Sequence, residues 1–441
     1  MDIKLWDLDI NHKDHLVFGG CDVVELAKIY GTPIYIVDEI KLRGNYHRFL
    51  NAFKNAYSKV KVFYSYKTNC IPGVVKVLNE EGCGAEVVSP YELWLALRLG
   101  VEPSEIIYNG VNKSAEDLRT AIQKHVGLIN VDSADEIYKL KRVSEEIKQR
   151  VNVGIRIYPG VGWKAQFGIE PNVDQIISLI KELNKTGFSN LCCLHVHIGT
   201  GIRNTKPYER VIKVVCSLLF DIKEKLNIDI QYLDFGGGFG VPTVKTFTTF
   251  EVGLYKIFNI PPQEPKEKDC PSVETFGQVI AYSLKKYSKL YDLKEPYLLL
   301  EPGRAITSNA QILLLTVGDI KKRRDGAKFA ITDGGMQNIA FPLSYEYHKC
   351  FLANRASPKP KDRYFVTGPL CSPEDLLYRN WKLLKLERGD ILAIMDAGAY
   401  FTSFSNNFSY PRPAVVLVSG NSRKLVRQHE SFEHITAMDK I

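Results

Sequence analysis

Between residues 62 and 304 the chain alternates short apolar runs with longer amphipathic stretches, and this alternation limits its fold more than any other feature. Eight runs have the character of strands: residues 62–67, 84–89, 105–110, 127–132, 153–158, 191–198, 230–237 and 297–304. Helix-length stretches separate them, and several begin with Ser, Asp or Pro, as helices commonly do. Eight such units within about 240 residues predict an α/β fold, the (β/α)8 or TIM barrel.

After Arg304 the pattern changes to strand-like runs separated by turn residues. These runs cover residues 310–320, 328–335, 363–370, 389–398 and 414–428, and the last contains a Gly-Asn hairpin turn. Two further runs, 4–10 and 15–20, precede the barrel pattern. We therefore predict a barrel over residues 31–304 and an all-β domain formed by residues 1–30 and 305–441. A proline-rich charged stretch at 261–269 either covers the barrel mouth or is solvated.

Composition excludes several classes of function. The net charge of +8 is spread along the chain, and its one tight basic run, residues 321–326, lies where a turn is expected, so nucleic acid is not a predicted partner. A secretory signal and a run of about 20 apolar residues are both missing, which predicts a cytoplasmic protein without membrane contact. Nine cysteines without metal-like spacing favour reduced thiols, with Cys192 and Cys193 in the core. His195 and His197 share a strand face, but no third ligand is near in sequence and no metal is predicted.

Polar residues or glycines end each predicted strand. In (β/α)8 barrels the chemistry gathers where the carboxyl ends of the strands meet the following loops. The strand-end residues are Lys67, Glu86, Asn109, Asp132, Arg156, His197, Gly236–Gly238, and Glu301 with Arg304. Lys67 can simply cap its strand and extend to water. Within this ring, however, it can hold an aldehyde as a Schiff base.

The stretch "DFGGGFG" supplies a candidate anion cradle. Three glycines after a strand let the backbone N–H groups approach a phosphate closely. The dinucleotide-binding fingerprint is absent, because its third glycine would fall at Val241 or Thr243. A glycine-rich turn without a ligand is the alternative.

Several widely spaced motifs resemble one known family over almost the whole chain. They are "FYSYKTN", "HVHIGTG", "LDFGGGFGVP", "EPGRAITSNAQILLLTV", "TGPLCSPEDLL" and "GDILAIMDAGAYFTSFSNNFSYPRP". In these stretches the sequence is similar to the fold-type III pyridoxal-phosphate decarboxylases, the diaminopimelate and ornithine decarboxylase group. The resemblance implies pyridoxal 5'-phosphate as cofactor, a barrel with an alanine-racemase-like C-terminal domain, and a carboxy-lyase acting on an amino acid.

The resemblance also implies roles for individual residues. Lys67 would form the Schiff base, His197 would stack on the pyridine ring, and Glu301 would pair with the ring nitrogen, since an opposite charge keeps that nitrogen protonated. Tyr400 would approach the cofactor from the β domain. The phosphate would be held by Gly236, Gly237, Gly238, Gly303 and Arg304. Cys371 would cross from a second subunit to protonate the product, which implies a homodimer with shared active sites.

The substrate position departs from the family pattern. Where relatives carry an acid after the cysteine, this chain has Ser372, and acids arrive later at Glu374 and Asp375. Phe341 replaces an arginine that binds the distal carboxylate of diaminopimelate, whereas Tyr345 is retained. The predicted substrate is therefore an amino acid that can be conjugated or carrier-bound. Its predicted contacts are Arg304, Tyr345, Ser372, Glu374 and Tyr400.

Two other functions remain open. A racemase on the same barrel is one, although Glu301 argues against it because a racemase is expected to present an arginine there. A non-catalytic homologue is the other, and the joint retention of Lys67, His197, Glu301 and Cys371 argues against it.

Overall fold

The eight predicted barrel strands close into one parallel barrel. The computed structural model describes residues 3–163, 165–185, 187–339, 342–357 and 361–440. The order around the barrel is β10-β11-β13-β5-β6-β7-β8-β9. The strands are β5 (Val60–Ser65), β6 (Gly84–Val87), β7 (Ile106–Tyr108), β8 (Leu128–Val131), β9 (Val151–Arg156), β10 (Ser189–His195), β11 (Tyr232–Asp234) and β13 (Tyr297–Leu300). The (β/α)8 prediction is confirmed.

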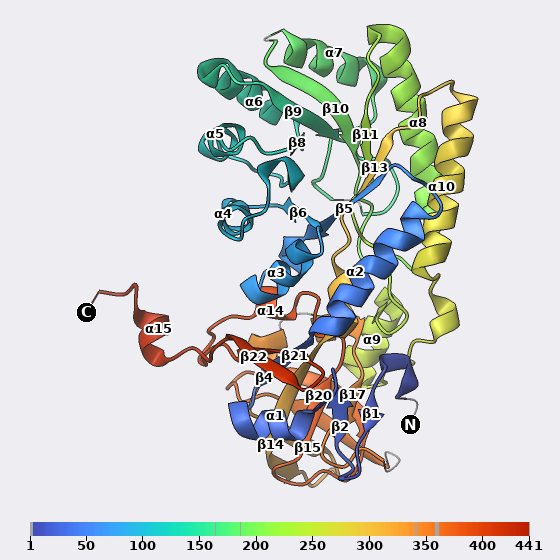
Figure 1. The fold of residues 1–441 in the computed structure, drawn as a ribbon. Coiled ribbons are helices and arrows are strands. Elements are labelled where there is room, and N and C mark those ends of the chain that lie inside the picture. Colours follow the sequence, from blue (N-terminus) through green and yellow to red (C-terminus); the bar gives the residue numbers. More distant parts are fainter. Residues whose placement is uncertain (1–2, 164, 186, 340–341, 358–360, 441) are drawn as a thin grey trace.

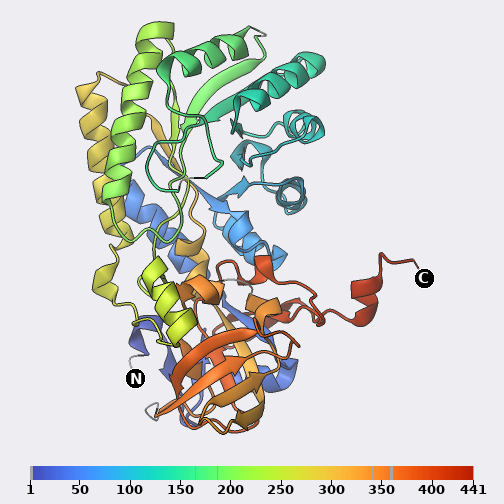
Figure 2. The same cartoon turned by 180° about the vertical axis from the view of Figure 1, so that it is seen from behind.

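Helices surround the barrel on its outside (Figures 1 and 2). They are α2 (Glu39–Lys54), α3 (Pro72–Glu80), α4 (Pro90–Arg98), α5 (Ala115–Gln123), α6 (Ala134–Ile147), α7 (Val173–Asn184), α8 (Lys206–Leu226) and α10 (Val273–Leu290). Local sequence explains where two of them begin. Ser89 and Ser133 cap α4 and α6 by accepting the N–H groups of Glu92 and Glu136.

The barrel interior is apolar at one end and polar at the other. Six buried side chains fill the apolar part: Phe63, Ile107, Leu128, Cys192, Cys193 and Leu299. This confirms the predicted core positions of Cys192 and Cys193. Polar groups are thereby confined to the carboxyl ends of the strands.

The second domain is built on a nine-stranded sheet. Its main path runs β19-β18-β15-β14-β4-β21-β22, and β20 joins β14 to β17. The strands are β4 (Ile34–Asp38), β14 (Gln311–Lys322), β15 (Lys328–Thr332), β17 (Cys350–Leu352), β18 (Asp362–Thr367), β19 (Leu376–Leu383), β20 (Ile391–Ile394), β21 (Ala414–Ser419) and β22 (Ser422–Arg427). Short helices lie in its loops, among them α11 (Arg304–Thr307), α12 (Met336–Ile339), α13 (Pro342–Tyr345) and α14 (Phe401–Phe404).

The barrel boundary predicted at residue 31 is wrong. β4 pairs with β14 and β21, so it belongs to the sheet of the second domain. The barrel part begins with α2 at Glu39. The run Ile34–Val37 is completely buried, and a short buried strand of this kind has the same sequence pattern in either domain.

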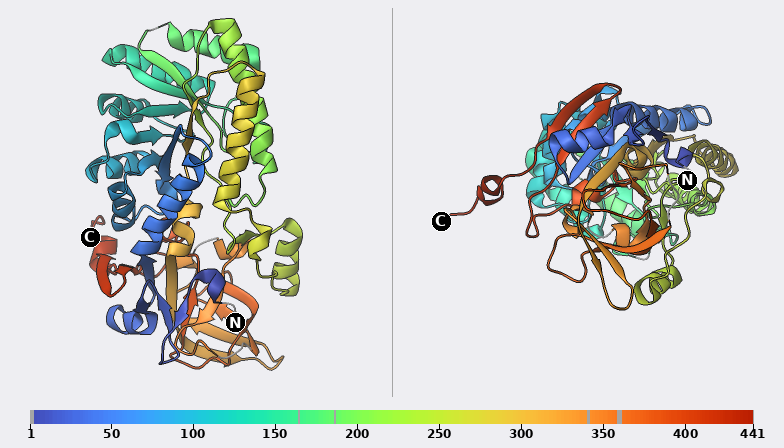
Figure 3. Two further views of the ribbon diagram at one scale, coloured as in Figure 1. Left: turned by 45° about the vertical axis from the view of Figure 1, so that its right-hand side comes forward. Right: turned by 90° about the horizontal axis from the view of Figure 1, so that it is seen from below.

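Residues 9–30 add a small sheet and a helix. β1 (Asp9–Ile10), β2 (Leu16–Phe18) and β3 (Cys21–Asp22) pair with one another, and α1 (Val23–Tyr30) follows. The predicted run 15–20 contains β2, but only the end of the predicted run 4–10 is a strand, because Lys4–Trp6 form a 3-10 helix. These strands form a sheet of their own. At the other end of the chain, α15 (Phe432–Thr436) projects away from the body of the molecule (Figures 1 and 3).

The insert between β11 and α10 contacts the second domain through residues 245–258, whereas most of its proline-rich stretch 261–269 is exposed, as the solvated alternative describes. Its strand β12 (Lys245–Thr246) pairs with β16 (Glu346–Tyr347). In its helix α9 (Thr249–Phe258), the hydroxyl of Tyr255 accepts the N–H of Arg379 at 2.9 Å. The insert thus connects barrel and β domain.

Other sequence predictions have plain outcomes. The basic run at 321–326 covers the end of β14 and most of the turn that leads to β15, and all nine cysteines are free thiols. Among the described residues, we find no helix whose length and hydrophobicity would suffice to cross a bilayer.

Candidate active site

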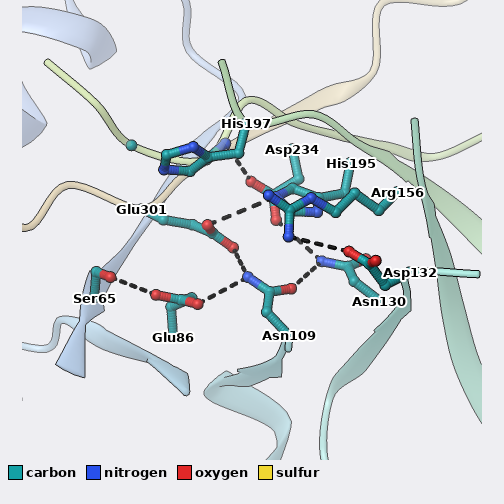
Figure 4. A network of polar contacts seen from close by, with 12 residues as sticks. Ser65, Glu86, Asn109, Asn130, Asp132, Arg156, His195, His197, Asp234 and Glu301 are labelled. Carbon is teal, nitrogen blue, oxygen red and sulfur yellow. Dashed lines mark hydrogen bonds and ion pairs between the residues drawn. The ribbon is translucent and has the colours of Figure 1, made fainter. Parts of the chain in front are cut away.

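The carboxyl ends of the barrel strands carry a buried network of polar side chains (Figure 4). Its members come from the ends of all eight barrel strands and face one another across the barrel mouth. They are Ser65, Glu86, Asn109, Asn130, Asp132, Arg156, His195, His197, Asp234 and Glu301. Sequence reasoning placed most of these at strand ends but did not single out Ser65, Asn130 or Asp234.

Lys67 faces this network and does not simply cap its strand. It lies in the 3-10 turn Tyr66–Thr68 directly after β5, and its Nζ is 3.0 Å from Oε2 of Glu86. About a third of its side chain is accessible, at 36%. Burial alone would lower the pKa of Lys67, but the carboxylates of Glu86 and Glu301 outweigh burial and raise it.

Glu86 and Asn109 link this lysine to the opposite side of the mouth. Glu86 is fully buried and accepts the hydroxyl of Ser65 at 2.5 Å. The Nδ2 amide of Asn109 donates to Glu86 at 2.9 Å and to Glu301 at 2.7 Å. The two carboxylates thereby share one amide donor.

Glu301 and Asp234 are both buried and lie side by side. Burial raises the pKa of Glu301 well above its usual value, and the nearby carboxylates of Asp234 and Glu86 raise it further. Burial likewise raises the pKa of Asp234. The Oε2 atom of Glu301 has no hydrogen-bond partner among the described residues. A buried acceptor of this kind is ready for a donor from a ligand.

His197 and the glycine turn lie beside this pair. A Cβ atom added to Gly236, whose φ is +58°, would approach the His197 ring to 2.6 Å. One added to Gly238, at φ +89°, would lie 2.2 Å from the carbonyl oxygen of Gly199. Only glycine therefore fits under the imidazole. Burial lowers the pKa of His197, and the charge of Lys67 lowers it further, so its ring is neutral.

Arg304 lies where the barrel meets the β domain. Its Nη2 is 2.6 Å from Oε1 of Glu346, and its guanidinium group lies over the Tyr400 ring at 5.4 Å. Its Nε and Nη1 atoms are buried and lack a hydrogen-bond partner within the described chain. The backbone N–H of Tyr400 donates to the carbonyl of Thr68 at 2.8 Å, so the β domain contacts the turn that carries Lys67.

The predicted substrate-contacting loop lies outside this network. Cys371 and Glu374 are exposed and Ser372 is half-buried in the connection between β18 and β19. In the described part of the chain, these three residues form no hydrogen bond or ion pair with Lys67, His197 or Glu301. Asp375 is buried and accepts the N–H groups of Met336 and Leu370, both at 2.7 Å. It fixes this loop.

Two further predicted positions complete the comparison with the sequence. Tyr345 ends α13 and is 46% exposed, with the ammonium group of Lys256 over its ring at 4.7 Å. Phe341 lies outside the described residues.

The residues present fit a phosphorylated pyridine aldehyde. Lys67 offers the amine, and Glu301 offers an unpartnered buried oxygen that a ring N–H can reach. The turn at Gly236–Gly238 and the free donors of Arg304 suit a phosphate or a carboxylate. Fold and site together define a (β/α)8-barrel enzyme of the class that uses pyridoxal phosphate.

Comparison with known proteins identifies the family. Residues 43–308 match the family described as "Pyridoxal-dependent decarboxylase, pyridoxal binding domain". The chain is 34% identical to the diaminopimelate decarboxylase of Methanothermobacter thermautotrophicus, covering 97% of this chain and 96% of that protein. It is 30% identical to the diaminopimelate decarboxylase of Aquifex aeolicus, with 98% of each covered.

A solved structure agrees with these relatives. The crystal structure of diaminopimelate decarboxylase from M. jannaschii in co-complex with L-lysine has a TM-score of 0.87 at 29% identity, covering 98% of each chain. This chain belongs to the pyridoxal-dependent decarboxylase family. It is accordingly a carboxy-lyase that removes carbon dioxide from an amino acid with the help of pyridoxal phosphate.

Proposed function

We propose that Lys67 is the residue that binds the aldehyde carbon of pyridoxal phosphate and that decarboxylation takes place above it. The observation that carries this proposal is the position of its amine, 3.0 Å from the carboxylate of Glu86, which is a buried member of the polar network in the barrel mouth. When bound, the cofactor supplies an electron sink for the pair of electrons left at Cα after carbon dioxide leaves.

The other mouth residues bind and orient. Glu301 faces the ring nitrogen, and His197 lies against the ring as a neutral imidazole. Gly237, Gly238 and Gly303 hold the phosphate through backbone N–H groups, and Gly236, whose own N–H is donated to Asp234, shapes the turn that brings them to it. Tyr400 completes this side of the site from the β domain, because its backbone is already hydrogen-bonded to the turn that carries Lys67.

Arg304 contributes binding of a carboxylate or of the substrate tail through its two unpartnered donors. Cys371 is the proton donor to the product, and it acts on the site of a partner subunit. Its exposure on a loop of the β domain supports this assignment, because a donor to its own barrel mouth would lie inside the network. The functional unit is therefore a homodimer.

The substrate is an amino acid with a conjugated or carrier-bound tail, contacted by Ser372, Glu374 and Tyr345. A neutral serine at the position of the family acid supports this choice, since a free ammonium group buried there without a partner would cost several kcal/mol. Free diaminopimelate is the second candidate, favoured by the names of the relatives.

The first test measures an absorbance band of the purified protein near the boundary between the ultraviolet and the visible range. Lys67→Ala is expected to abolish the band and the release of carbon dioxide. Lys61→Ala is the matched control, because Lys61 lies on β5, the strand that leads to Lys67, but is exposed and paired with Glu105. A band that persists in Lys67→Ala contradicts the assignment.

The second test separates the subunits and the substrates. Mixing Lys67→Ala with Cys371→Ala subunits is expected to restore about one quarter of the wild-type activity if each site is shared, and no activity if both residues act within one chain. Carbon dioxide release from diaminopimelate, ornithine, lysine and their conjugates then ranks the substrates. Faster turnover of free diaminopimelate than of any conjugate would overturn our first choice.

A further inference from the structure

Asn109 lies between two carboxyl groups of the mouth (Figure 4), and none of the proposed roles uses it. It directly follows β7 and is buried, and its backbone N–H donates to the carbonyl of Val87 at 2.8 Å. Its side-chain nitrogen Nδ2 is 2.9 Å from Oε1 of Glu86 and 2.7 Å from Oε1 of Glu301. Its side-chain oxygen accepts Nδ2 of Asn130 at 2.8 Å. Both polar atoms of this side chain are therefore used.

A primary amide is the one side-chain group that can make this set of contacts. Its nitrogen carries two N–H groups, one for each carboxyl, and its oxygen is the acceptor that Asn130 needs. The reverse orientation would put the oxygen of Asn109 against two acceptors. A hydroxyl has a single donor, an imidazole has its nitrogens on different sides of the ring, and lysine and arginine lack an acceptor. The geometry thus selects an amide at position 109.

The two carboxyl groups divide their oxygens in the same way. Each gives Oε1 to Asn109. Oε2 of Glu86 is 3.0 Å from Nζ of Lys67, the proposed partner of the aldehyde. Oε2 of Glu301 has no hydrogen-bond partner among the described residues, and Nε2 of His195 lies 3.7 Å from it, beyond hydrogen-bonding distance. Asn109 thereby joins the amine end of the site to the end that faces the ring nitrogen.

The spacing of these two ends matters because the ligand is rigid. In pyridoxal phosphate the aldehyde carbon is attached opposite to the ring nitrogen, so its two partners must be held one ring apart. Groups that are already in place lose less freedom when a ligand binds. A neutral carboxyl accepts an N–H as well as a carboxylate does, so the contact of Asn109 with Glu301 holds in either protonation state.

We propose that Asn109 is a positioning residue that fixes Glu86 and Glu301 at the spacing of one pyridine ring. One side chain then serves both the aldehyde end and the nitrogen end of the cofactor. The inference rests on the proposed function of Lys67 and Glu301.

The test compares cofactor affinity in wild type and in Asn109→Leu, since leucine has nearly the same shape but no donor. Three ligands separate the two ends of the site. They are pyridoxal phosphate, 4-deoxypyridoxine phosphate, which lacks the aldehyde, and the 1-deaza analogue of pyridoxal phosphate, in which carbon replaces the ring nitrogen. Equilibrium dialysis of the full chain, stripped of cofactor, gives the dissociation constant of each ligand.

Asn109→Leu should weaken the binding of pyridoxal phosphate by roughly tenfold to a hundredfold, the loss expected for hydrogen bonds to charged groups. Each analogue reports on one end only. The loss should therefore be smaller for each, about threefold to tenfold, because the two ends contribute separately to the affinity.

A second variant and a control make the test specific. Asn109→Asp keeps the shape and the acceptor for Asn130 but has no N–H group, so it should show the same order of losses. Asn152→Leu is the matched control. Asn152 lies on barrel strand β9, is exposed, and donates to the carbonyl of Gly127 at 3.1 Å, so all three dissociation constants should equal those of wild type.

Equal losses for the three ligands in the Asn109 variants would overturn the proposal and leave Asn109 with a role in the fold alone. Unchanged affinity for either analogue would also overturn it, because only one end would then depend on Asn109. Failure of the proposed function would look different, since the wild-type protein would then lack a band that depends on Lys67.

Discussion

Two buried carboxyl groups of this chain have pKa values that are shifted in opposite directions. Glu301 lies in the barrel mouth and Glu346 lies in the β domain, and each side chain is less than a tenth exposed. Burial raises the pKa of Glu301 and neighbouring carboxylates raise it further. Burial acts on Glu346 in the same direction, but the charges of Arg304 and His348 override it and lower its pKa to about 2.

The difference follows from where the cations lie. Arg304 comes three residues after Glu301 in sequence, yet it points to Glu346 at 2.6 Å. In the mouth, Lys67 is bound to Glu86 and Arg156 is paired with Asp132. At the junction, the place where Arg304 contacts Glu346 between barrel and β domain, the charges therefore stabilise the fold. In the mouth, Glu301 has an oxygen whose partner must come from a ligand.

The largest predicted effect comes from breaking the junction. Arg304→Met leaves Glu346 buried without its main partner, and we expect the free energy of unfolding to fall by about 3–5 kcal/mol. Urea denaturation of the purified protein measures this change.

Arg48→Met is the matched control. It breaks the exposed pair with Glu274, whose atoms are 2.9 Å apart, and should change stability by less than about 1 kcal/mol. Equal losses in the two variants would show that the junction pair is no more important than a surface pair.

An intermediate effect is expected at a third buried carboxyl. Within the part of the chain that the structure describes, neither a cation nor a second carboxyl pairs with Asp375, which accepts the backbone N–H groups of Met336 and Leu370. Asp375→Ala leaves both donors unsatisfied and should cost about 1.5–3 kcal/mol. Hydrogen exchange should also quicken in residues 368–375, the loop that carries Cys371.

Glu374→Ala is the control for this loop, because Glu374 is exposed and its carboxylate is bound to Ser372. Its stability should stay within about 0.5 kcal/mol of wild type. Unchanged exchange in Asp375→Ala would mean that the loop is held by other contacts.

The sequence predicted the mouth better than the junction, and the reason is physical. Strand ends of a (β/α)8 barrel converge whatever the side chains are, so Lys67, His197 and Glu301 could be placed together from strand positions. Asn130 and Asp234 sit within or at the ends of apolar runs, and whether they face inward depends on the stagger of the closed barrel. No sequence period reveals that stagger.

The junction depends on contacts between distant segments. The pairing of Arg304 with Glu346 requires the fold of the β domain, and the pairing of β4 with β14 and β21 joins segments hundreds of residues apart. The buried run Ile34–Val37 gave no sign of which sheet it would join. Such long-range choices are decided by packing and not by local pattern.

The smallest predicted effect is a slope of stability with pH, and it has opposite signs in the two regions. Glu346 has a lowered pKa, so its contribution is complete above its ordinary value of 4.5 and is lost as the pH falls toward about 2. Glu301 has a raised pKa, so its contribution is complete below 4.5 and is lost as the pH rises toward the raised value. One proton changes stability by at most about 1.4 kcal/mol per pH unit.

Glu301→Gln should therefore flatten the alkaline side of the stability curve and leave the acid side unchanged, measured by urea unfolding between pH 3 and 9 on protein stripped of cofactor. The amide keeps an oxygen to accept from Asn109 but cannot lose a proton. The loss of stability that ionisation of Glu301 causes at alkaline pH should therefore shrink by about 1 kcal/mol. An alkaline slope identical to that of wild type would show that the mouth carries no stored proton. The contrast between the two carboxyls would then be one of geometry alone.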